Sequence, residues 1–139
     1  IISSSRVLPQ ELRMMQNRFE PYQLHHLLYY AKLLVTDTQT TTTEAAVLGT
    51  PAVRYNTFVG PNDMGNFIEL EKKYGLIYSF KNFNEALRKV KELVKRKNLK
   101  QEWHKKRKKL LNDKVDVTEW MVRFFEKKFK IPGYERGAG

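Results

Sequence analysis

The chain has 139 residues, which favours a single domain, and it contains no cysteine, so disulfides, thiol catalysis and thiolate zinc sites are excluded. No apolar run approaches the roughly 20 residues of a membrane helix, and no signal peptide is visible, so we expect a cytoplasmic protein. The net charge of +11 lies in residues 81–139, because residues 1–80 contain seven basic and seven acidic residues.

The first eighty residues alternate between short apolar runs and helical segments. Residues 1–5 are predicted to form a strand, and the chain opens on it without a methionine, so we expect a fragment or processed product of a longer chain. Helices are predicted near residue 10 and at 21–31. The next predicted elements are a strand at 33–36, a helix at 42–48, a strand at 52–55, a helix at 66–74 and a strand at 76–80. This alternation predicts an α/β fold with a Rossmann-like parallel sheet and flanking helices.

Residues 81–131 are predicted to form basic helices at about 84–97, 100–112 and 117–130, followed by a frayed tail at 132–139. Apolar residues recur at helical spacing in the first and last of these helices. They are Phe83, Leu87, Val90, Val94, Val117, Trp120, Met121 and Phe124. This stripe predicts that the helices pack on the same domain and leave their lysines as a solvated face. A run of cations at 105–109 leaves weak, non-specific binding of polyanions as a second expectation.

The segment TDTQTTTTEAAVLGTPAV lies where a predicted strand ends and a helix begins. In a parallel sheet this edge is where ligands bind, and the helix N-terminus offers unpaired N–H groups that suit phosphate. We therefore predict a phosphate-binding turn at Thr38, Gln39, Thr40 and Thr41. The alternative is that these threonines only cap and solvate the turn, because no glycine-rich loop is present.

Glu44 has two interpretations that the sequence leaves open. Thr41-x-x-Glu44 has the spacing of a capping box, in which Glu44 would accept a hydrogen bond from the backbone of Thr41. Its carboxylate could instead accept hydrogen bonds from the hydroxyls of a sugar. From the residues alone the capping role is favoured.

Further polar residues are candidates for loop and sugar contacts. Asn56, Asp63 and Asn66 surround the loop after the predicted strand at 52–55, where they could equally be turn formers and a helix cap. Arg6 leaves the first predicted strand at the same edge and could neutralise phosphate. His25 is a weaker candidate on the 21–31 helix. Three histidines without suitable carboxylate spacing predict no metal site.

The segment YYAKLLVTDTQTTTTEAAVLGTPAVRYN resembles the C-terminal half of GT-B nucleotide-sugar proteins, among them the UDP-N-acetylglucosamine 2-epimerase family. The longer segment from residue 27 to 78 looks like an uncharacterised domain family related to those enzymes. The resemblance implies the C-terminal lobe of a GT-B fold, with UDP or a UDP-sugar as ligand and no other cofactor. It also implies a missing N-terminal lobe, toward which the last helix would pack.

The resemblance also implies roles for individual residues. The epimerases have Asp-Ser-Gly-Gly where this chain has Asp37-Thr38-Gln39-Thr40, and that turn holds the nucleotide diphosphate. Their ribose-binding glutamate falls on Glu44. This chain departs from the pattern where Gln39 and Thr40 replace two glycines, so its backbone cannot approach phosphate as closely.

The function expected from the sequence is therefore nucleotide-sugar binding by part of a glycosyltransferase- or epimerase-like protein. The isolated chain is predicted to be inactive, because the resemblance implies a site completed by a second lobe. Two alternatives stay open: a basic nucleic-acid-binding module and a non-catalytic GT-B relative that acts in assembly, including as an oligomer.

Overall fold

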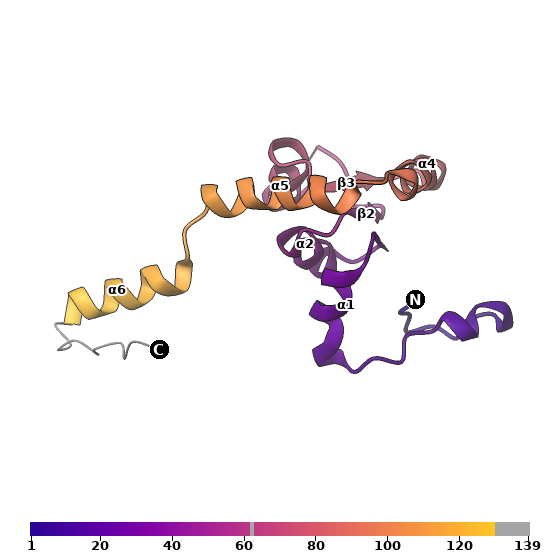
Figure 1. The fold of residues 1–139 in the computed structure, drawn as a ribbon, viewed down its shortest axis with the longest axis horizontal. Helices are drawn as coiled ribbons and strands as arrows, with labels where there is room; N and C mark the ends of the chain where they lie inside the picture. The colour runs from indigo at the N-terminus through magenta and orange to yellow at the C-terminus, as the bar shows by residue number, and fades with distance from the viewer. Residues whose placement is uncertain (62, 130–139) are drawn as a thin grey trace.

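The computed structural model describes residues 1–61 and 63–129 (Figure 1). Asn62, within the turn predicted at 60–63, and the tail predicted at 132–139 lie outside the described residues.

A three-stranded parallel sheet forms the centre of the fold. Its strands are β1 (Leu34–Thr36), β2 (Ala52–Tyr55) and β3 (Ile77–Phe80), in the order β1-β2-β3. The middle strand is buried along Ala52, Val53 and Arg54, as expected for a parallel strand covered on both faces. The structure confirms a mixed α/β fold with a parallel sheet and flanking helices.

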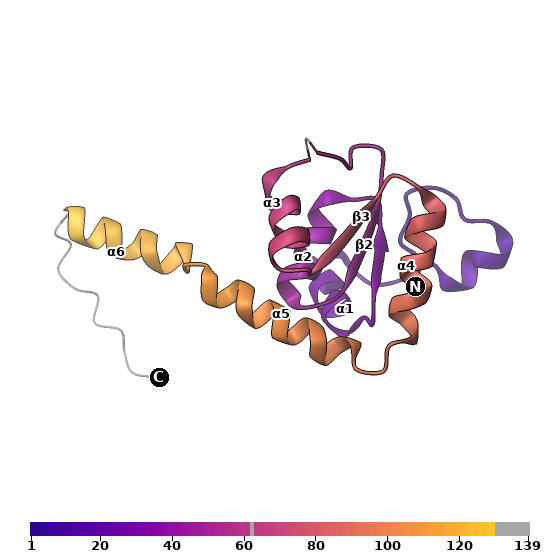
Figure 2. The same cartoon turned by 90° about the horizontal axis from the view of Figure 1, so that it is seen from above.

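Helices cover both faces of the sheet. Figure 2 shows α2 (Gln39–Leu48) and α3 (Gly65–Ile68) on one side and α4 (Phe83–Lys95) on the other. The short helix α3 continues as a π-helical turn, η3 (Glu69–Lys73), so the helix predicted at 66–74 is divided in two. The helix α1 (Leu24–Tyr30) follows a 3₁₀ turn, η2 (Pro21–Gln23), and packs against α2.

The end of α2 explains why glycine and threonine stand between α2 and β2. Gly49 has a φ of 81°, and a Cβ at this position would lie 2.9 Å from Cδ of Arg107. Any other residue would be strained and crowded there. The buried hydroxyl of Thr50 donates to the carbonyl oxygen of Leu28 at 2.7 Å, which fixes α1 to the start of β2.

The N-terminal segment differs from the prediction, because residues 1–5 form no strand. Ile2 makes a single bridge with Gln16, after the 3₁₀ turn η1 (Gln10–Met15). Residues 3–5 are serines, and Ile1, Val7 and Met14 are exposed. The segment therefore offers too few apolar contacts to add a strand to the sheet.

The C-terminal helices also differ from the expected arrangement. α5 (Leu99–Asp113) buries Leu99, Trp103 and Leu110 against the body, whereas α6 (Val117–Phe129) contains no buried residue and projects away from the body (Figures 1 and 2). Its aromatic rings stack along the helix, with Trp120 against Phe124. The expectation that all three basic helices pack on the domain is therefore wrong for α6, because α5 already carries the chain past the body.

An ion-pair cluster holds the end of α5 to η3. Lys114 lies 2.8 Å from Glu69, Lys73 lies 3.3 Å from Asp113, and the Tyr74 hydroxyl bonds Asp113 at 3.1 Å. The hydrogen bond from Lys114 lowers the pKa of Glu69 below its ordinary value of 4.5. The bonds from Tyr74 and Lys73 lower the pKa of Asp113 below 3.8. Both carboxylates therefore favour the folded state in their ionised form.

The first prediction concerns this cluster. Because the folded pKa values are depressed, the stabilisation is present above the unfolded values of 4.5 and 3.8 and is lost as pH falls through the lower folded values. The variant with Glu69→Gln and Asp113→Asn should have a lower urea midpoint than the native chain at pH 6. The difference should shrink progressively below pH 4.5. Glu11→Gln, at an exposed position without an ion pair in the described residues, is the control. A difference that grows on acidification would contradict this assignment.

The second prediction uses the two tryptophans. The ring of Trp103 is fully buried and its Nε1 donates to the carbonyl oxygen of Leu76 at 2.7 Å, whereas Trp120 is 57% exposed. Trp103→Phe leaves a buried carbonyl without its donor, so it should lower the free energy of unfolding by about 1–3 kcal/mol. Trp120→Phe should leave it nearly unchanged. Urea denaturation of both variants checks this, and equal losses would show that α6 is packed in solution.

Candidate functional site at the carboxyl edge of the sheet

Parallel pairing brings the ends of the three strands to one edge of the sheet. β1 ends at Thr36, and the following turn is held by its own hydroxyls. The backbone N–H of Thr38 donates to Oγ1 of Thr36 at 3.1 Å. The hydroxyl oxygens of Thr36 and Thr38 lie 3.0 Å apart. The turn that leads to α2 is therefore ordered by local side-chain bonds.

The N-terminus of α2 lies directly after this turn. The helix begins at Gln39, three residues before the predicted start, because the hydroxyls of Thr42 and Thr43 donate within the helix. Thr42 bonds the carbonyl oxygen of Thr38 at 2.6 Å. Thr38 is the N-cap residue, but its side chain makes no capping bond, so the first N–H groups of the helix remain available to a ligand.

Asn56 joins the same edge from β2. Its Nδ2 donates to the carbonyl oxygen of Asp37 at 3.1 Å, and its Oδ1 accepts from the backbone N–H of Phe58 at 2.9 Å. The amide therefore fixes the loop after β2 to the turn after β1. Of the predicted loop contacts, this is the one that the structure brings to the threonine turn.

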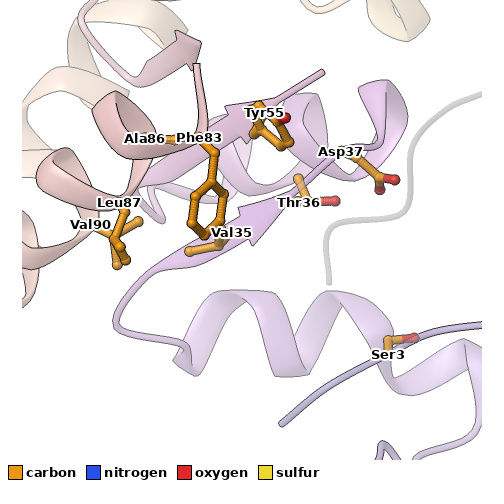
Figure 3. Close-up of a pocket in the computed structure, with 9 residues that line it drawn as sticks. All are labelled: Ser3, Val35, Thr36, Asp37, Tyr55, Phe83, Ala86, Leu87 and Val90. Atoms are coloured by element: carbon orange, nitrogen blue, oxygen red, sulfur yellow. The ribbon is translucent and has the colours of Figure 1, made fainter. Parts of the chain in front are cut away.

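Two cavities open on this edge, and both are lined in part by Val35, Thr36 and Asp37. The larger has a volume of about 560 Å³ and combines the polar group Thr36, Asp37, Thr38 and Thr41 with apolar side chains of α1. The smaller has a volume of about 370 Å³. Figure 3 shows Phe83 beside Val35 in the smaller cavity, with Asp37 beyond them. The edge thus offers polar groups next to apolar walls, as small-molecule sites commonly do.

Glu44 does not form the predicted capping box. Thr41 lies inside α2 rather than at its N-cap position, so Glu44 is not three residues from the cap. Its Oε1 lies 3.4 Å from Nε2 of His25 on α1, and its Oε2 is buried without a hydrogen-bond partner among the described residues. His25 is thus placed beside Glu44, and neither residue is among those that line the two cavities of this edge.

The remaining predicted residues lie elsewhere. Arg6 is exposed on the N-terminal segment, and its backbone N–H bonds Ser4. Asn66 is exposed in the first turn of α3. Asp63 forms an ion pair with Arg54. None of these three has a hydrogen bond or ion pair with the threonine turn among the described residues.

Arg54 and Asp37 are polar residues of this edge that were not among the predicted site residues. The Arg54 side chain is fully buried on β2. The signal was present in the sequence, since Arg54 is the one charged residue in an apolar run of strand length. A charge in a strand covered on both faces must find a partner.

The cations of α5 divide into two groups. Lys106 donates to the carbonyl oxygen of Gly75 at 3.0 Å, and Nε of Arg107 donates to that of Val47 at 2.6 Å. Lys105, Lys108 and Lys109 are exposed. Part of the basic run is therefore structural, and the rest forms the expected solvated face. In residues 1–61 and 63–129 no cluster of three or more acidic or histidine side chains could hold a metal, and no helix could cross a membrane.

Comparisons with protein-family models, with curated proteins and with solved structures find no match to this chain.

Proposed function

We propose that this chain binds a nucleotide sugar, with a UDP-sugar as ligand, at the N-terminus of α2. The observation that carries the proposal is the uncapped start of α2, which lies beside a cavity of about 560 Å³ at the carboxyl edge of a parallel sheet. Unpaired N–H groups and the positive end of the helix dipole favour a diphosphate there. The hydroxyls of Thr38, Thr40 and Thr41 are further hydrogen-bonding groups for it.

The carboxylate of Asp37 bears on the class of ligand. It is exposed at the same edge and would repel a bare phosphate close to it. A ligand that also carries hydroxyl groups can donate hydrogen bonds to this carboxylate. A nucleotide sugar has both features, so the combination of helix N–H groups with Asp37 favours it over a free anion.

Glu44 is the proposed ribose-binding residue. It lies one turn after Thr41 in α2, and Thr41 lines the larger cavity. The capping role that competed with this assignment is removed by the helix start at Gln39. The buried Oε2 of Glu44 has no hydrogen-bond partner among the described residues, so it could accept a hydrogen bond from a ribose hydroxyl.

This chain is proposed to be part of a longer glycosyltransferase- or epimerase-like protein that has a second lobe. The exposed apolar face of α6 supports this part of the proposal, since residues 1–61 and 63–129 leave Trp120, Phe124 and Phe125 uncovered. The open cavities at the sheet edge support it as well, because a second lobe would close the site and orient the reacting groups.

The third prediction tests ligand binding. UDP titrated into the ¹⁵N-labelled chain should shift the backbone amides of residues 38–44, because the diphosphate contacts the α2 N-terminus. Uridine, which lacks the diphosphate, should shift Gln39 and Thr40 far less. Lys108→Gln, on the solvated face of α5, should bind UDP as the native chain does. Shifts confined to residues 81–139 would overturn the proposal.

The fourth prediction tests Glu44. Glu44→Gln should weaken UDP binding by about 1.5–3 kcal/mol, since a charged acceptor for the ribose is replaced by a neutral one. Its melting temperature should stay nearly unchanged, because Glu44 caps no helix. Calorimetric titration and thermal unfolding provide the two measurements, with Glu126→Gln on α6 as the matched control. A loss of stability with unchanged affinity would assign Glu44 to the His25 contact alone.

A further inference from the structure

The central strand carries a buried charge that the proposed function does not use. Arg54 has a fully buried side chain, and Asp63, its ion-pair partner, is only 7% exposed. The guanidinium carbon lies 4.0 Å from the centre of the Phe67 ring, so Arg54 is held between a carboxylate and an aromatic face. Such a geometry fixes the guanidinium in one position.

The guanidinium keeps donors that Asp63 does not use. Asp63 is bonded to Nη2, whereas Nε and Nη1 are buried and have no hydrogen-bond partner among the described residues. An arginine has five N–H donors, and a buried donor without an acceptor is costly. The buried hydroxyl of Ser79 also lacks a partner among these residues, and Ser79 is directly opposite Arg54 in the β2–β3 register.

A cavity of about 360 Å³ lies next to Ser79 and Asp63. Its polar lining consists of Ser79, Asp63, Glu71 and Lys72. The buried Arg54 does not line it, but Asp63, its ion-pair partner, and Ser79, its neighbour in the sheet, do. The cavity is distinct from the two cavities beside β1, although Thr36 pairs with Arg54 in the sheet register. A second group of polar side chains therefore meets a cavity near the same edge of the sheet.

We infer that Arg54 and Ser79 form a second binding site, which takes an oxyanion of a small ligand, phosphate or carboxylate, with Asp63 as the competing internal carboxylate. Arginine suits such groups because its guanidinium donates several charge-assisted hydrogen bonds. Lys72 is the cation of the cavity lining, and its Nζ lies 4.0 Å from Oε1 of Glu71. Because Asp63 occupies one edge of the guanidinium, the ligand and Asp63 share or exchange this partner. The inference stands on other residues than the α2 N-terminus and does not require nucleotide binding there.

The experiment uses the complete ¹⁵N-labelled chain with inorganic phosphate as the probe, at constant ionic strength set with chloride. The side-chain Nε–H signal of Arg54, identified by its loss in Arg54→Lys, should shift saturably, together with the amide of Ser79. Acetate in a parallel titration distinguishes a carboxylate from a phosphate preference. The signals of Gln39 and Thr40 report separately on the α2 N-terminus, so this site and the nucleotide site can fail independently.

Two variants distinguish ligand binding by Arg54 from a purely structural role of its ion pair with Asp63. Asp63→Asn removes the competing carboxylate, so phosphate affinity should rise about tenfold, whereas Ser79→Ala should lower it. Lys108→Gln controls for general surface charge and should change nothing. An Arg54 Nε–H signal that phosphate leaves unmoved would overturn the inference, as would a lower affinity in Asp63→Asn. If Asp63→Asn fails to fold, the titration of the native chain and Ser79→Ala still decides the question.

Discussion

Burial of the Arg54 guanidinium in the central strand is the constraint on which the edge of this sheet depends. A strand covered on both faces leaves a charge no access to water, so Arg54 requires a carboxylate from another segment. Asp63 supplies it, and its Oδ1 also accepts from the backbone N–H of Met64, the N-cap residue of α3. One ion pair thus returns the loop after β2 to the sheet and sets where α3 begins.

Much of the central fold could be predicted from local pattern, because its signals lie within a few residues of one another. The strands at residues 33–36, 52–55 and 76–80 differ from β1, β2 and β3 by a residue at most. The start of α2 was missed, since Thr42 and Thr43 bond inside the helix rather than cap it. The strand at residues 1–5, the packing of α6 and the pairing of Asp63 depend on distant contacts, which periodicity does not report.

The difference between local pattern and distant contacts also applies to the charged residues. The sequence predicted one solvated basic face, but the backbone carbonyls of Tyr29, Gly75 and Val47 accept hydrogen bonds from Lys100, Lys106 and Arg107. These cations fix α5 to the body at three points. The net charge of residues 81–139 therefore overstates the charge that is free to meet a polyanion, and nucleic-acid binding loses part of its basis.

The sheet edge combines hydrogen-bond donors with a carboxylate, and it is not a general positive surface. The α2 N-terminus presents N–H groups, whereas Asp37 beside it presents a carboxylate. Asp37 repels any anion, but the hydroxyl groups of the proposed ligand could donate hydrogen bonds to this carboxylate while the helix N–H groups donate to its diphosphate. A polyanion without such hydroxyl groups could not match this. Asn56 keeps this arrangement in place by bonding the carbonyl oxygen of Asp37. Under the proposed function, the edge would discriminate between ligands by this pattern of donors and acceptors, which the helices of the basic region do not provide.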